Sequence, residues 1–430
     1  MTSEGIRSAC VVIDGERIQS VAASDAVSDF VDFGGKLILP GLIDTHVHMN
    51  EPGRTEWEGF ASATRAAAAG GITPVIDMPL NNLPETTTVA ALEQKRAAAR
   101  GQCFVDYGFW GGVVADNQPH IRALAAAGVL GYKCFLVHPG IEGFTMVTPE
   151  HLEAAMPAVA ATRLPLLVHA ELPGPIEAAH LALGHAPDWR RYSTYLASRP
   201  EAAEIEAIRL LIDLSRRYQA RVHIVHLSAA LALPDLRSGR AEGLPITAET
   251  CPHYLYFASE HIEDAATNWK CAPPIRSTAN RDLLWQALQD GDIDLIASDH
   301  SPCPPEMKQR GAGDFSLAWG GIASLQLSLS IVWTEAVKRG ISLERVVEWM
   351  SEGPAKLAGL AGTKGRIAPG YDADLVIFDP DREFDVDARS LHHRHPITPY
   401  AGHRLRGVVE KAFLRGRAIG GEPTGRECRP

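Results

Sequence analysis

The chain has 430 residues, of which 46% are hydrophobic and 22% are charged, and this balance excludes a disordered or fibrous protein. Its 41 basic and 52 acidic residues give a formal net charge of −11. An acidic chain without a basic run is a poor candidate for binding nucleic acid or an anionic membrane. No stretch reaches the roughly 18 uninterrupted apolar residues typical of a membrane-spanning helix, so the sequence indicates a globular protein of one large domain or two to three ordinary ones.

The cysteine pattern and the first residues bear on cellular location. Residues 1–15 contain neither the apolar core nor the cleavage pattern of a secretory signal, so we expect a protein that is not secreted. The chain has 7 cysteines, an odd number, and no two of them form a Cys-x-x-Cys pair. This usage is typical of reduced thiols rather than of a disulfide framework or a thiolate zinc site. We therefore predict a cytoplasmic protein.

Both ends of the chain are short, strand-like and punctuated by turns. They span residues 1–36 and 364–420, and residues 365–379 predict a turn followed by a buried strand. Neither piece is large enough to fold alone, so we expect residues 1–36 and 364–430 to form one composite β-sandwich. The last residues, 420–430, are expected to be frayed.

Between these ends, residues 37–363 repeat one rhythm, in which short β-branched or apolar runs alternate with helical segments. The expected strands are residues 37–44, 72–78, 104–109, 129–135, 164–169, 222–226, 246–250 and 293–298. The expected helices are residues 58–69, 89–100, 120–127, 149–160, 201–217 and 280–288. This alternation over about 260 residues matches the size of a (β/α)₈ TIM-type barrel. The alternative is a doubly wound open sheet, and the placement of the polar residues favours the barrel.

The first barrel strand ends in Asp44-Thr-His46-Val-His48. Because residues two apart on a strand share a face, both imidazoles are expected to point inward, at the barrel end where active sites lie. Imidazole is a common ligand for zinc and similar metals. A His-x-His pair alone is a weak signal, since such pairs arise often by chance.

Other strand ends repeat this chemistry. His169 closes the fifth strand, His226 closes the sixth, and Asp299 follows the eighth. Chance is then a poor explanation, and the pattern predicts a metal site within the barrel. His223 precedes His226 by an odd number of residues, so on a regular strand only one of them faces the site. We expect His226 to be the ligand and His223 to be a packed or hydrogen-bonded histidine behind the sheet.

Lys133 ends the fourth strand, where an ammonium group would repel a metal cluster. It either points outward, pairs with an acid, or carries a carbamate formed from its amine and CO₂. The charge balance favours the carbamate. Two divalent cations with four neutral histidines and Asp299 leave a large positive excess, which a bridging carbamate and a hydroxide would reduce to about +1 in a site of low dielectric.

With these residues placed, the chain resembles the cyclic amidohydrolase branch of the amidohydrolase superfamily over nearly its whole length, including the split sandwich. Members of this branch carry His-x-His, Lys, His, His and Asp on strands one, four, five, six and eight. The resemblance implies two divalent metal ions, with zinc first and cobalt, manganese or nickel as alternatives, and a small-molecule substrate. It also implies a homo-oligomer, by family pattern a homotetramer. The metal ligands that it implies are His46, His48, Lys133 as a bridging N6-carboxylated lysine, His169, His226 and Asp299, of which Asp299 is also catalytic.

Within that branch, several segments resemble the allantoinases: residues 77–81, 249–255, 270–276, 298–303 and 319–326. Dihydroorotases usually hold the substrate carboxylate with an arginine at the position of Asn50 and an asparagine at that of Ala272, so both departures argue against dihydroorotate. Hydantoinases often carry a tyrosine where this chain has His138. The resemblance therefore implies hydrolysis of (S)-allantoin to allantoate in purine degradation. The alternatives are a dihydropyrimidinase or hydantoinase and, more remotely, a metal-free scaffold protein.

Uncharged residues near the strand ends are candidates for contacts to the substrate. The candidates are Asn50, Asn81 and Ala272, although the asparagines would serve equally well as turn caps. We expect His253 and His300 to hydrogen-bond to the metal ligands rather than to bind metal. The histidine-rich residues 392–395 are expected on a solvated loop.

Overall fold

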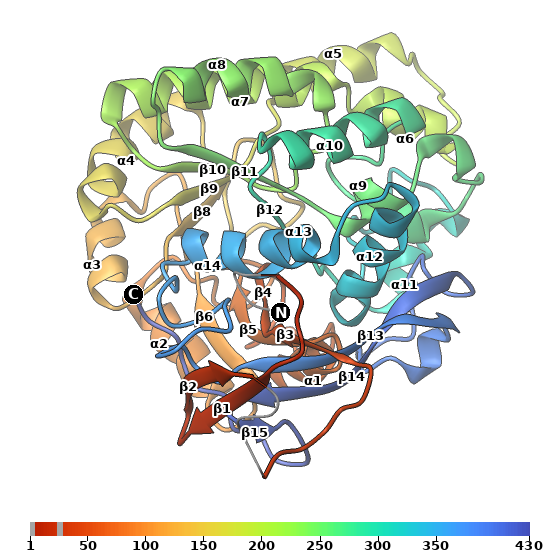
Figure 1. Cartoon of the computed structure of the whole chain (residues 1–430). Helices are drawn as coiled ribbons and strands as arrows, with labels where there is room; N and C mark the ends of the chain where they lie inside the picture. Colours follow the sequence, from red (N-terminus) through yellow and green to blue (C-terminus); the bar gives the residue numbers. More distant parts are fainter. Residues whose placement is uncertain (1–4, 24–28) are drawn as a thin grey trace.

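The computed structural model describes residues 5–23 and 29–430, and its centre is a ring of parallel strands (Figure 1). In order around the ring, these are β4 (Leu42–Val47), β5 (Ile72–Asp77), β6 (Asp106–Phe109) with its continuation β7 (Gly111–Gly112), β8 (Tyr132–Phe135), β9 (Leu166–His169), β10 (Val222–Ile224), β11 (Ile246–Thr250) and β12 (Leu295–Ile296). A parallel bridge from Val47 to His300 links the first and last members of the ring. The expected (β/α)₈ barrel is confirmed.

Helices surround this ring and follow nearly every strand (Figure 1). They are α1 (Phe60–Ala69), α2 (Val89–Ala99), α3 (Ile121–Ala126), α4 (Pro149–Thr162), α5 (Pro173–Ala182), α6 (Tyr192–Ser198), α7 (Glu201–Tyr218), α8 (Leu233–Ala241), α9 (Pro252–Tyr256), α10 (Thr278–Asp290), α11 (Pro305–Lys308), α12 (Ser328–Lys338), α13 (Leu343–Val347) and α14 (Gly353–Leu357). None of the helices in the described part of the chain combines the length and apolarity that a membrane crossing requires.

Helix α7 illustrates why these segments form and pack. Its first turn carries acidic residues and its last turn carries Arg216 and Arg217, which suits the helix dipole at both ends. Ile208 and Leu211 on its inner face join the same buried cluster as Val222 of β10. The main core therefore lies between the strands and the helices, and the strand ends remain available for a site.

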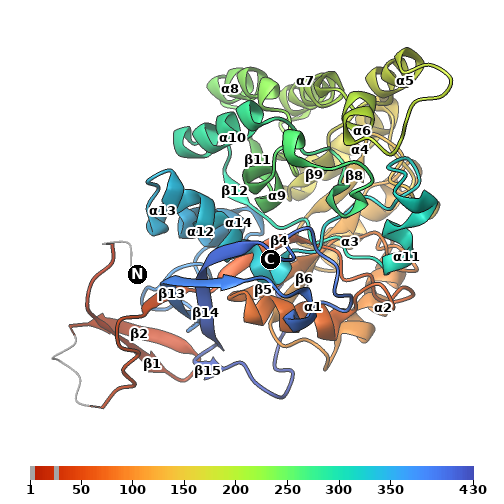
Figure 2. The ribbon, with the colours of Figure 1, turned by 90° about the vertical axis from the view of Figure 1, so that its right-hand side faces the viewer.

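The terminal strands form a second unit beside the barrel (Figure 2). One sheet has the order β15 (Arg417–Ala418), β14 (Arg404–Leu414), β13 (Leu375–Asp385) and β3 (Leu37–Pro40), and a hairpin joins β1 (Cys10–Asp14) to β2 (Arg17–Ala22). The strand expected over residues 37–44 is thus divided at Gly41, where a side chain would collide with Thr73. The division into units 1–36 plus 364–430 and 37–363 stays a prediction. Strand β3, which falls in the second unit, pairs with β13 of the terminal sheet.

The C-terminal tail is packed against the barrel, so the expectation of a frayed end was wrong. The amide of Cys428 donates to the carbonyl of Tyr107 at 2.6 Å, and the amide of Arg426 donates to Asp106 Oδ1 at 2.7 Å. Asp106 also pairs with Arg415 and, at 2.9 Å, with Lys364. A buried carboxylate at the start of β6 therefore fixes the tail in place.

Candidate metal centre

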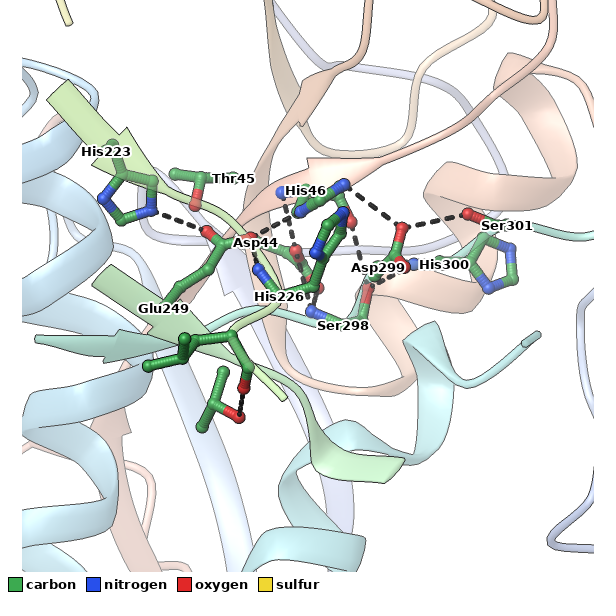
Figure 3. A network of polar contacts seen from close by, with 12 residues as sticks. Asp44, Thr45, His46, His223, His226, Glu249, Ser298, Asp299, His300 and Ser301 are labelled. Carbon is green, nitrogen blue, oxygen red and sulfur yellow. Dashed lines mark hydrogen bonds and ion pairs between the residues drawn. The ribbon is translucent and has the colours of Figure 1, made fainter. Parts of the chain in front are cut away.

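Three of the predicted ligands, His46, His48 and Asp299, meet at the carboxyl end of β4, and Figure 3 shows the contact between His46 and Asp299. His46 Nε2 lies 3.1 Å and His48 Nε2 lies 3.6 Å from the same oxygen, Oδ1 of Asp299. The ligand atoms of these residues all lie within 4.8 Å of one another, and all three residues are buried. The prediction that both imidazoles face inward is therefore confirmed, and this group is compact enough to hold a metal ion.

His226 and His169 continue the cluster from the neighbouring strands. The ring centroid of His226 lies 5.4 Å from that of His46 and 4.6 Å from that of His169. His169 Nε2 lies 2.7 Å from Glu171 Oε2, so its other ring nitrogen, Nδ1, is the one left to bind metal. The structure thus brings these two histidines together beside the His46 group.

Lys133 lies at the same end of β8 and is fully buried. Its Nζ lies 4.6 Å from the ring centroid of Phe135 and has no hydrogen-bond partner among the described residues. Burial lowers the pKa of this amine to about 8, against the opposing influence of Glu249 and Asp299. Among the described residues, Lys133 therefore neither points outward nor pairs with an acid.

Glu249, near the end of β11, contacts two histidines of the cluster. The sequence pattern had assigned no role to this residue. Its Oε1 lies 2.5 Å from His46 Nδ1, and its Oε2 lies 3.0 Å from His223 Nε2. Burial lowers the pKa of His46, but the two neighbouring carboxylates, Asp299 and Glu249, outweigh it and raise that pKa to about 9. Glu249 therefore fixes the ring orientation of His46 and favours positive charge at its Nε2 end.

The contact with Glu249 also corrects the expectation for His223. His223 Nδ1 lies 2.8 Å from Thr247 Oγ1, and its other nitrogen reaches the carboxylate that holds His46. His223 is buried and hydrogen-bonded as predicted, but it belongs to the network of the site, so its predicted place behind the sheet was wrong. The alternation of a strand does not apply here, because β10 ends at Ile224 and His226 has a φ of 39°.

Comparisons with known proteins agree with this geometry. The model of the amidohydrolase family matches residues 37–419. The chain belongs to the amidohydrolase family. An allantoinase of Streptomyces avermitilis is 49% identical to this amidohydrolase over 97% of this chain and 93% of its own, and an allantoinase of Arabidopsis thaliana is 44% identical over 98% and 87%. Among solved structures, an L-hydantoinase (dihydropyrimidinase) from Arthrobacter aurescens superposes with a TM-score of 0.94 at 31% identity, covering 100% of this chain and 97% of its own.

Membership in the amidohydrolase family implies a binuclear metal site, and the residues present fit one. The donor set is four histidines and a carboxylate, all buried, with Lys133 Nζ and His226 Nδ1 lacking partners among the described residues. Buried polar atoms are normally satisfied, so these atoms indicate a group that the protein side chains do not supply. His46 and His48 have their Nε2 atoms on Asp299, which suits one ion, and His169 and His226 suit another.

A pocket of about 440 Å³ opens over this amidohydrolase centre and is lined by His46, His48, His169, His226 and Asp299 among others. Asn81 and Ala272, two of the candidate substrate contacts, also line it. Asn50 is not part of the wall that the described residues form, and its Nδ2 donates to the carbonyl of Pro302 at 3.4 Å. A contact between Asn50 and the substrate stays a prediction.

The rings of His253 and His300 form no hydrogen bond to a candidate ligand among the described residues, so that expectation was wrong. His300 Nδ1 accepts a hydrogen bond from the amide of Ser324 at 3.2 Å, and its ring contacts that of His393 at 4.8 Å. His253 is fully buried, and one of its ring nitrogens lies within 4.8 Å of Asp299. His393 is also buried, so the expectation that residues 392–395 form a solvated loop fails at this position.

Proposed function

We propose that this protein hydrolyses (S)-allantoin to allantoate, in the degradation of purines. The observation that carries the reaction class is the convergence of four histidines and Asp299 on one pocket, with the buried Lys133 on the neighbouring strand β8. The choice of substrate is supported by the identity of 49% with an allantoinase over 97% of the chain. The neutral residues Asn50 and Ala272, where dihydroorotases carry groups that hold a carboxylate, agree with an uncharged cyclic substrate.

We further propose that the centre holds two divalent ions, zinc in the first place and cobalt, manganese or nickel as alternatives. His46, His48 and Asp299 would hold one ion, and His169 and His226 the other. Lys133 would bridge them as a carbamate, formed when its neutral amine adds to CO₂ and releases a proton. The full burial of Lys133 and its unpartnered Nζ support this bridge, because a buried amine without a partner is otherwise costly.

Asp299 is the residue placed to move the proton. When bound, the metal ions lower the pKa of a water molecule and polarise the amide carbonyl of the substrate. Asp299 accepts the proton of the attacking water and delivers it to the ring nitrogen as the carbon–nitrogen bond breaks. Ser301 Oγ donates to Asp299 Oδ1 at 3.0 Å and holds the carboxylate toward His46 and His48.

A substrate panel of allantoin, hydantoin, dihydrouracil and dihydroorotate with metal-loaded enzyme tests this function. We expect kcat/KM for allantoin to exceed that for dihydroorotate by orders of magnitude. Faster turnover of dihydrouracil or hydantoin than of allantoin would favour the alternative, a dihydropyrimidinase or hydantoinase. That alternative rests on the structural likeness to the hydantoinase of Arthrobacter aurescens. Purified protein that binds no metal would instead support a scaffold protein.

Assembly and location complete the proposal. We propose a homotetramer by resemblance to the branch, which size-exclusion chromatography with light scattering tests directly. A cytoplasmic location agrees with the cysteines, which are all free thiols. Fractionation of the source cells would contradict this location if the protein were recovered outside the cytoplasm.

A further inference from the structure

The charges that line the pocket are unevenly distributed. Apart from Asp299, the described residues place no carboxylate in its wall, whereas Arg199, Lys270 and Arg310 all line it. Two of these cations have a local explanation. Arg199 Nε donates to Glu171 Oε1 at 3.0 Å, and Arg310 is exposed to solvent. Lys270 is the cation left without an explanation, because it forms no ion pair with any carboxylate in residues 5–23 and 29–430.

Lys270 is held firmly at this position. Its Nζ donates to the carbonyl of Ala318 at 2.6 Å and lies 5.4 Å from the ring centroid of Tyr195. Its own carbonyl accepts from Lys308 Nζ at 3.0 Å and from the amide of Gly321 at 2.9 Å. An ammonium group has three donors, and the described residues use one of them. The side chain is therefore fixed in the pocket wall with donors to spare.

A partly buried cation without a counter-charge is costly, and such groups concentrate where a ligand uses them. Burial, with the nearby charges of Lys308 and Arg199, lowers the pKa of Lys270 to about 7. The groups that contact Lys270 Nζ in the pocket wall are the carbonyl of Ala318 and the ring of Tyr195, neither of which belongs to a candidate metal ligand.

We propose that Lys270 is a specificity-determining residue whose ammonium group donates to the exocyclic ureido carbonyl of the substrate. This inference rests on the proposed function, because allantoin carries a ureido group on its ring and hydantoin does not. The ring carbonyl under attack must lie at the metal centre, so the group that reaches Lys270 is a different carbonyl. The ureido arm extends farther from the ring than any other oxygen-bearing group of allantoin. The arm is thus the part of the substrate suited to the wall formed by Lys270, Tyr195 and Ala318, none of which is a candidate metal ligand.

The test compares Lys270→Met and Lys270→Gln with wild type, and Arg310→Met serves as the matched control because it removes the same charge from the pocket rim. For each enzyme, KM and kcat are measured with allantoin, and hydantoin is titrated as a competitive inhibitor. Metal content and thermal unfolding establish that each variant is folded and loaded. Loss of a hydrogen bond from a charged donor predicts that KM for allantoin rises about 10- to 100-fold in Lys270→Met, with less change in kcat.

The inhibition constant for hydantoin is expected to stay within about threefold of wild type, because hydantoin lacks the arm that Lys270 binds. Lys270→Gln keeps a donor and should lie between wild type and Lys270→Met, and Arg310→Met should leave the ratio of the two constants unchanged. An equal loss of affinity for allantoin and hydantoin, or no loss for either, would overturn the inference. Failure of the proposed function is distinguishable, since it would appear in the wild type as an absence of allantoin turnover.

Discussion

Glu249 offers the sharpest test of how the metal centre is built. Its two oxygens lie 2.5 Å from His46 Nδ1 and 3.0 Å from His223 Nε2, and the carboxylate is fully buried. Glu249→Ala leaves both ring nitrogens without a partner. Each unsatisfied buried polar group costs about 1–3 kcal/mol, so the free energy of unfolding of the metal-free protein should fall by about 2–6 kcal/mol. Removal of a buried charge offsets part of this loss.

The same substitution should weaken metal binding, because the carboxylate orients His46 and raises the basicity of its Nε2. Loss of a partner of this kind typically reduces metal affinity about 10- to 100-fold. Glu249→Gln is the matched variant, since its amide keeps the shape and can still bond to both rings while lacking the charge. We expect Glu249→Gln to retain most of the stability and to lose metal affinity.

Competition with a chromophoric chelator measures the affinity, and chemical denaturation of the metal-free proteins measures the stability. The two readouts separate the roles of shape and charge, because only the alanine variant should lose stability strongly. Wild-type metal affinity in both variants would refute the idea that Glu249 tunes His46. A stable Glu249→Ala protein that loses metal would instead show that the two histidines find other partners.

Three further predictions concern other residues. Asp299→Asn should reduce kcat by at least about 10²- to 10⁴-fold with allantoin, and a variant that keeps a tenth of the activity with metal present would assign the proton transfer elsewhere. Lys133→Ala should lose metal and activity, with partial rescue by acetate or propionate, and chelator-stripped enzyme should regain activity with added metal faster when bicarbonate is present. Retention of two ions by Lys133→Ala without rescue would contradict the bridge. Burial, with the charges of His300 and His392, lowers the pKa of His393 to about 3 despite the opposing charge of Glu58. As the pH falls, the unfolded chain therefore binds a proton at this histidine before the folded protein does. The free energy of unfolding should decrease as the pH drops below about 6.5. At about pH 4.5 this loss amounts to about 3 kcal/mol, and urea unfolding of His393→Gln should show a smaller fall.

The barrel and most of its ligands were predictable because they depend on local patterns. Four of the expected strands end at or just before a histidine or an aspartate, and parallel strands of a barrel bring their carboxyl ends together whatever lies between them. His46, His48, His226 and Asp299 could therefore be placed in one site from spacing alone. The same reasoning failed for His223, because it assumed a regular strand through His226, whose φ of 39° breaks the alternation.

Contacts between residues far apart in sequence were not predictable in this way. Asp106 holds Arg426 and Arg415, which follow it by 320 and 309 residues, and no local pattern signals such a partnership. Glu249 and Glu171 lie at or just past strand ends, as the ligands do, and that position was the available signal for them. Histidine spacing alone does not single out these two glutamates.

The network around the centre separates two kinds of ligand. His46 and His169 each have one ring nitrogen on a buried glutamate, Glu249 or Glu171, and Glu171 is held in turn by Arg199. These rings are oriented by the protein before any ion binds. Lys133 Nζ and His226 Nδ1, in contrast, lack partners among the described residues. Lys133 and His226 therefore lack the orienting carboxylate that His46 and His169 have. We expect the order of Lys133 and His226 to depend on CO₂ and metal, whereas His46 and His169 are oriented by carboxylates that the chain itself supplies.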